Sequence, residues 1–222
     1  MSGTAMTSFG ADAVWLLIRS VRWTLLLTGI ALGIGGLLGA VMALLRLSGN
    51  RWVRQGAAGY IGLIQSIPVL MILFQSYYGL PLAGVDLPPL LAAGVSLSIY
   101  ASAYFAEIWR GAIEAVPHQQ WEASASLALT RAHQYRYVIL PQALRQALPP
   151  TVGFLVQLVK NTSIVSVVGL AELARTAQLV NNATVQPFKV FGLVALIYFV
   201  ICFPLSRLSR VLERRLHAGR AR

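Results

Sequence analysis

Five long apolar runs dominate the sequence, and they restrict its fold more than any other feature. They cover residues 24–45, 56–80, 90–113, 147–168 and 188–205. A helix needs about 20 apolar residues to cross the hydrocarbon core of a bilayer. Because lipid offers no water to unpaired backbone groups, helices are the spanning structures that such runs form. The sequence therefore predicts an all-α membrane protein with about five transmembrane helices, joined by polar stretches such as 170–187.

The charge content agrees with a membrane protein. Charged residues make up only 11% of the chain and hydrophobic residues 57%, whereas soluble domains contain about 25% charged residues. A net charge of +11 could indicate a nucleic-acid partner. The basic residues flank the apolar runs, however, and do not form one soluble basic face. We therefore expect contact with membrane lipid and no nucleic-acid partner.

The basic residues also predict how the chain is oriented. They gather in the first loop, around the third loop and in the C-terminal tail, as Arg46, Arg51, Arg54, Arg110, Arg131, Arg136, Arg145, Arg207, Arg210, Arg214, Arg215, Arg220 and Arg222. With five spans, these groups share the cytoplasmic side only if the N-terminus is outside and the C-terminus is cytoplasmic. Arg19 and Arg22, which precede the first span, oppose this orientation but are outnumbered.

Several spans carry residues that lipid alone does not favour. Gln65 and Ser66 precede Pro68 in the second run, and the sequence Lys160-Asn161-Thr162-Ser163 lies in the fourth. Polar side chains inside a membrane usually face protein or a water-filled cavity. In the first run, the pairs Gly29–Gly33 and Gly35–Gly39 have the spacing that permits close helix packing. The sequence thus indicates spans that pack on one another and enclose polar groups.

We find no pattern that indicates catalysis. The chain lacks the GxxxxGK[ST] loop that binds nucleotide phosphates. His118, His133 and His217 are not spaced with other ligands as in metal sites, and no serine belongs to a recognisable triad motif. We expect a protein that is not an enzyme and that itself holds no cofactor or metal.

A polar loop with a helix-favouring composition separates the third and fourth runs. Residues 122–141 read EASASLALTRAHQYRYVILP, and Pro117 is well placed in a first helical turn. Trp121, Ala125 and Ala128 are spaced to share one helix face. We expect one short helix over residues 116–131, lying near the membrane plane.

This stretch resembles the EAA loop of membrane subunits of bacterial ABC importers. Glu122, Ala123, Ile139 and Pro141 match the pattern, while Ser124 replaces its second Ala and Ala128 replaces its Gly. Because alanine lacks the conformational freedom of glycine, we expect a helical path with little bend at Ala128.

The resemblance extends over most of the chain. Segments 66–68, 104–117, 141–149 and 160–163 are similar to the polar amino acid branch of that family, although Gln65 and Gln119 stand where Arg and Gly are common. It implies one ABC importer transmembrane domain over residues 1–222, with multiple spans in the bacterial inner membrane. Its implied function is that of a permease subunit for a polar amino acid. Glutamate or aspartate, glutamine, histidine, arginine, cystine and opines are all compatible substrates.

The resemblance also implies partners and site residues. The partners are a second permease subunit, identical or related, a substrate-binding protein in the periplasm or at the cell surface, and a cytoplasmic ABC ATPase dimer that uses ATP and Mg. In the family, a helix in this loop inserts into the ATPase. The coupling residues here would be Glu122, Ala123, Ser124, Ala128 and Arg131. In the alternative, the loop helix is solvated and Glu122 only favours its own helix dipole.

The same resemblance makes the 160–163 segment a candidate lining of the substrate path. Lys160 could meet a substrate carboxylate, or it could snorkel to the interface; Asn161, Thr162 and Ser163 follow it. Glu107 could bind a substrate ammonium, or it could simply pair with Arg110 one helical turn away. Gln65 and Ser66 are weaker candidates for the path.

Two other functional classes stay open on the residues alone. A secondary transporter would need its own ion-coupling site and usually shows internal repeats, which are not visible here. A membrane assembly subunit without transport would leave the polar second and fourth spans unexplained. Purification with an ATPase partner would separate both from an importer.

Overall fold

The structure is a computed structural model that describes residues 9–220, with side chains described up to Leu216. Within this range the regular elements are all helical. Four segments are long and apolar enough to cross a membrane: α1 (Ala11–Arg46), α5 (Pro89–Glu114), the run 131–168 and α10 (Pro187–Arg220). A bent helix pair makes a fifth candidate. The predicted all-α fold with about five spans is therefore confirmed.

Helices α1 and α5 pack closely because two glycines of α1 face α5. A Cβ added at Gly35 would lie 2.7 Å from the Cβ of Ala101, and one at Gly39 would lie 2.7 Å from the Cβ of Phe105. At Gly29 and Gly33, an added Cβ would meet no atom of another element within 4 Å among the described residues. Only the second predicted glycine pair therefore serves helix packing within this chain.

The second span is broken where Pro68 stands. Helix α2 (Arg51–Ser66) ends before Ile67, and α3 (Val69–Phe74) begins after Pro68, followed by the π-helical segment η1 (Gln75–Gly79) and α4 (Leu80–Leu82). The two parts are bent by 100°. Proline lacks an N–H for the helix and pushes the preceding residue to an extended conformation, which Ile67 adopts.

The fourth span is a run of joined helical segments. It comprises α7 (Arg131–His133), the π-helical η2 (Gln134–Ile139), α8 (Leu140–Asn161) and the 3₁₀ segment η3 (Thr162–Val168). Beyond it, the stretch predicted as a polar connection contains a helix, α9 (Leu173–Thr184). Its buried residues Leu173, Ala177 and Val180 pack against Leu17 of α1 and Val190 of α10.

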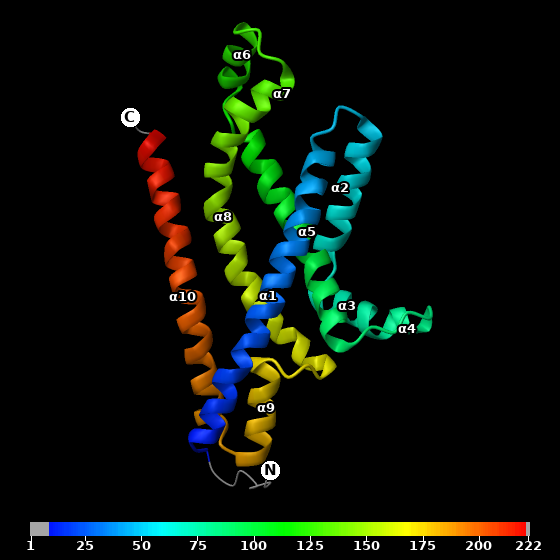
Figure 1. The fold of residues 1–222 in the computed structure, drawn as a ribbon, viewed down its shortest axis with the longest axis vertical. Coiled ribbons are helices and arrows are strands. Elements are labelled where there is room, and N and C mark those ends of the chain that lie inside the picture. Colours follow the sequence, from blue (N-terminus) through cyan, green and yellow to red (C-terminus); the bar gives the residue numbers. More distant parts are fainter. Residues whose placement is uncertain (1–8, 221–222) are drawn as a thin grey trace.

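The loop between the third and fourth spans lies at the same end of the bundle as the other basic segments. Figure 1 shows α6 (His118–Ser126), α7, the connection between α1 and α2, and the C-terminal end of α10 together at one end. Helix α9 and the start of α1 lie at the other end (Figure 1). The predicted grouping of the three basic segments is thus present. The side chain of Arg220, and Arg222, lie outside the described part of the chain.

Candidate functional site

Helix α6 is fixed to the bundle by an aromatic anchor. Pro117 precedes the first residue of α6. On α6, Trp121 meets Tyr135 of η2 edge to face, with ring centroids 5.0 Å apart. Trp121 and Tyr135 pack around a small core of Ile113, Val116, Ile139 and Ala143. Because this core joins the ends of α5 and α8, a displacement of α6 would be transmitted to both spans.

The loop helix is shorter than predicted and ends in a sharp turn at Ala128. Helix α6 ends at Ser126, and Ala128 has a φ of +56°. The N–H of Leu129 donates to the carbonyl of Ser124 at 3.3 Å, and that of Ala128 to the carbonyl of Ala125 at 2.9 Å. These two bonds form a Schellman motif, which places a left-handed residue after the helix. The expectation of one helix to Arg131 with little bend at Ala128 was therefore wrong. Two otherwise unsatisfied helix carbonyls gain partners, which offsets the cost of the left-handed alanine.

The predicted coupling residues divide between two faces of this loop. Glu122 and Ala123 are exposed, whereas Ser124 is buried and donates to the carbonyl of Trp121 at 2.9 Å. A hollow of about 510 Å³ beside α6 is lined by Glu122, Ala125 and Arg131, among others. Trp121 and Ala125 share the predicted face, but Ala128 lies beyond the helix. Of the five predicted coupling residues, Ser124 is buried and the other four, Glu122, Ala123, Ala128 and Arg131, are exposed.

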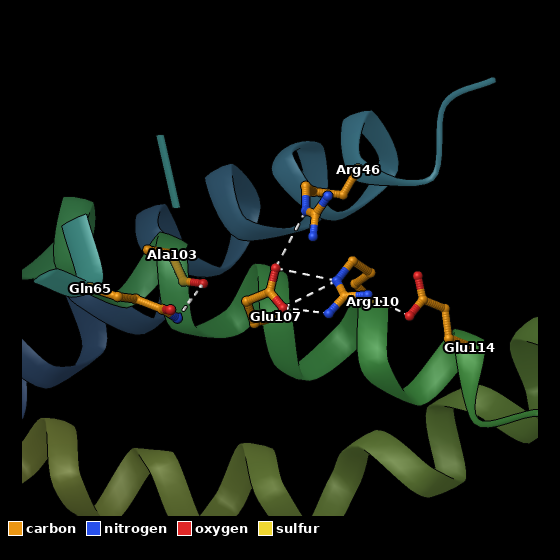
Figure 2. Close-up of polar contacts among 6 residues, drawn as sticks. All are labelled: Arg46, Gln65, Ala103, Glu107, Arg110 and Glu114. Atoms are coloured by element: carbon orange, nitrogen blue, oxygen red, sulfur yellow. Dashed lines mark hydrogen bonds and ion pairs between the residues drawn. The ribbon is translucent and has the colours of Figure 1, made fainter. Parts of the chain in front are cut away.

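Figure 2 shows an ion network that joins α1 to α5 near the same end. The Glu107 carboxylate accepts from Arg46 Nε of α1 at 3.5 Å and from Arg110 Nη2 at 2.6 Å. Arg110 also pairs with Glu114. The predicted pairing of Glu107 with Arg110 is therefore confirmed. A substrate ammonium at Glu107 would have to displace an arginine.

The other candidates of the second span lie beside this network. Gln65 Nε2 donates to the carbonyl of Ala103 at 3.5 Å, one helical turn before Glu107 on α5 (Figure 2). Ser66 bonds back to the carbonyl of Gly62 at 2.7 Å. Gln65 and Glu107 are thus brought to one side of α5, next to the break in the second span.

The four residues at 160–163 point in different directions. Lys160 is exposed in a groove against α10, beside Tyr198 and Ser206. Thr162 donates to the carbonyl of Val159 at 2.8 Å and Ser163 to that of Lys160 at 2.7 Å. Both hydroxyls therefore donate to backbone carbonyls of their own helical run. A hydroxyl engaged in this way is less able to bind a substrate in the path.

Asn161 differs from its neighbours because its side-chain amide faces α3 and α5. It is buried beside Val69 and Leu73 of α3. Its Oδ1 accepts from Gln157 at 3.3 Å, and its Nδ2, which makes no hydrogen bond of ordinary geometry among the described residues, faces the hydroxyl of Tyr100 on α5. The Asn161 amide therefore lies buried between α3 and α5.

Sequence reasoning missed Glu172, a fully buried carboxylate that begins α9. It accepts from the N–H groups of Ala174 at 3.0 Å and Arg175 at 2.8 Å, and from the hydroxyl of Tyr198 of α10 at 3.4 Å. Burial raises the pKa of the Glu172 carboxyl, and the backbone bonds oppose that rise. Leu173, Ala177, Val180 and Thr184 follow the helical spacing that could have revealed α9.

Comparison with known proteins gives consistent matches. Residues 35–218 match the family described as "Binding-protein-dependent transport system inner membrane component". The chain is 39% identical to the "Probable glutamine ABC transporter permease protein GlnM" of Bacillus subtilis (strain 168), over 87% of this chain and 89% of that protein. It is 35% identical to the "L-cystine transport system permease protein TcyB" of the same organism, over 94% of each.

A solved structure agrees with these matches. The chain superposes on the "Crystal structure of an amino acid ABC transporter with histidines" with a TM-score of 0.87 and 36% identity. The match covers 97% of this chain and 100% of that chain.

Proposed function

The chain belongs to the binding-protein-dependent transport system inner membrane components, and we propose that α6 is the helix through which ATPase subunits drive it. It is a permease subunit of an amino acid ABC importer and a multi-pass protein of the inner membrane. ATP hydrolysis in this family belongs to a separate subunit. The alternatives of a secondary transporter and of an assembly subunit without transport are therefore set aside.

The coupling proposal is supported by how α6 is presented. The helix stands at one end of the bundle, exposes Glu122 and Ala123, and borders a hollow that a partner could fill (Figure 1). On the opposite face, the buried Ser124 and the partly buried Trp121 attach the helix to the bundle. A partner would contact Glu122, Ala123 and Arg131, while Ser124 and Ala128 shape the loop. The single observation that carries the proposal is this exposed helix with a partly buried aromatic anchor.

The orientation follows from the grouping of basic segments. The end that carries α6 also carries the α1–α2 connection and the arginines of α10. Basic loops favour the cytoplasmic side. We therefore place α6 and the C-terminus in the cytoplasm and the N-terminus outside, with residues 1–222 forming one transmembrane domain.

The proposed complex has two permease subunits, identical or related, two ATPase subunits and a substrate-binding protein outside. Relatives named for glutamine and cystine support a polar amino acid as the substrate. Within this chain, the candidate path runs beside the broken second span. Asn161 offers an amide donor there beside Tyr100, and Gln65 and Glu107 lie along α5. Lys160, which faces α10, would join the path only if the second subunit covers that groove.

A charge reversal on α6 tests the coupling. In the complete importer reconstituted in vesicles, Glu122→Lys should abolish most of the ATPase stimulation by the substrate-loaded binding protein, while membrane insertion is unchanged. Glu213→Lys, the same charge change on the exposed side of α10 at the same end, is the control. Full stimulation in Glu122→Lys would refute the role of α6.

A further inference from the structure

A basic hollow between α8 and the end of α10 lies outside the proposed coupling face and substrate path, although Gln142 in its lining donates to Gln120 of α6 at 3.2 Å. It has a volume of about 460 Å³ and is lined by Arg145 and Leu148 of α8 and by Leu212, Arg215 and Leu216 of α10, among others. From its charge and position we propose that it binds the headgroup of an anionic phospholipid. This proposal does not depend on the proposed role of α6.

The charges of the hollow are uncompensated. Among the residues that the structure describes, neither Arg145 nor Arg215 forms an ion pair. On α10, Arg207, Arg210 and Arg214 add positive charge, against Glu213 alone. A phosphate diester would supply the missing negative charge, and guanidinium groups bind phosphate through paired N–H donors.

The surroundings favour a lipid over a free anion. The hollow lies between segments 131–168 and 187–216, both of which are candidate membrane spans. Leu148, Leu212 and Leu216 line it, and Leu144 and Leu208 are exposed beside it. Apolar surface next to cations at the end of a span matches the two halves of a phospholipid. Acyl chains would cover the leucines while the arginines hold the headgroup.

The position suggests what a bound lipid would do. Ser209 of α10 donates to the carbonyl of Pro149 of α8 at 2.8 Å, so the two helices already touch at this level. A phosphate bonded to Arg145 and Arg215 would add a second link nearer the helix ends. Since α8 continues through η2 to the loop that carries α6, the lipid would brace the span that moves with that loop.

Native mass spectrometry of the complete importer tests the site. The protein is titrated with a palmitoyl-oleoyl phosphatidylglycerol in a background of the matching phosphatidylcholine. Arg145→Gln with Arg215→Gln should weaken phosphatidylglycerol binding about thirtyfold, from roughly five- to sixfold per cation. Arg51→Gln with Arg54→Gln, which removes the same charge from exposed positions outside the hollow, should leave the site occupied. Arg145→Lys with Arg215→Lys keeps the charge but not the paired N–H donors, so it should bind phosphatidylglycerol more tightly than the double glutamine variant and more weakly than the parent protein.

Two further arms separate the possible occupants. Inorganic phosphate and acyl-free glycerophosphoglycerol, each at millimolar concentration, should not displace the lipid. Displacement by either would overturn the proposal, because the site would then recognise only an anion. Unchanged phosphatidylglycerol affinity in the double glutamine variant would also overturn it. So would loss of the ATPase subunits from that variant with lipid binding intact, since the hollow would then be a protein contact.

Discussion

The left-handed alanine after α6 makes a local test of the proposed coupling loop possible. Ala128 has a φ of +56°, a conformation that costs a residue with a Cβ about 1–2 kcal/mol. Glycine avoids that cost but loses about 0.5–1 kcal/mol more conformational entropy on folding. The difference predicts that Ala128→Gly stabilises the turn by about 0.5–1 kcal/mol. Because the Schellman bonds hold Ala128 and Leu129, local opening of this turn should become rarer.

Hydrogen exchange measured by mass spectrometry reads this opening directly. The peptide that contains residues 127–130 should exchange about two- to fivefold more slowly in Ala128→Gly. Ala125→Gly is the matched control, because the same replacement inside α6 costs about 1 kcal/mol of helix stability. It should speed exchange in the same peptide region. Faster exchange in Ala128→Gly, or the same direction of change in both variants, would refute the reasoning.

Two other predictions concern the bundle. Gly39→Val should lower the thermal midpoint of unfolding by about 2–10 °C, because overpacking costs about 1–3 kcal/mol and its Cβ would lie 2.7 Å from that of Phe105. Gly33→Val, where an added Cβ meets nothing within 4 Å, should change it little; equal losses would show that the α1–α5 contact is not tight. Burial raises the pKa of the Glu172 carboxyl, so the folded protein binds this proton more tightly than the unfolded chain does. The free energy of unfolding therefore falls as the pH rises from the unfolded pKa toward the folded one. As the pH is raised above the ordinary range of a carboxyl group, the thermal midpoint should therefore drop more in the parent protein than in Glu172→Gln, and parallel pH profiles would contradict this.

The spans can be predicted well from the sequence because a backbone in lipid must satisfy its own hydrogen bonds, which restricts a long apolar run to a helix. The long apolar runs became α1, α5, α8 and α10, and Pro68 broke the second span as a proline does. The same reasoning failed at α9, where the overall polarity of the stretch hid the regular spacing of Leu173, Ala177 and Val180. Burial of that stripe against α1 and α10 is a tertiary property that composition does not report.

The candidate site was predictable in its position and less so in its geometry. The resemblance placed a helix in the loop, and Trp121 and Ala125 do share a face. The turn at Ala128 was missed because the prediction considered only the energetic cost of a left-handed alanine. It did not consider the two helix carbonyls that gain hydrogen bonds in the Schellman motif. One of the two partners of Glu107 was predicted, because Arg110 is one helical turn away in the sequence. The other, Arg46, belongs to α1 and can be identified only from the fold.

The most direct test of the account is a covalent contact between α6 and the ATPase. Cys202 is the single cysteine of the chain, so a Cys202→Ala background lets a thiol-directed photo-crosslinker be attached at one chosen position. In the complete importer, Ala123→Cys should give an adduct with the ATPase subunit. Val185→Cys, exposed at the opposite end of the bundle, should give none. An ATPase adduct from position 185 and none from position 123 would contradict the central claim.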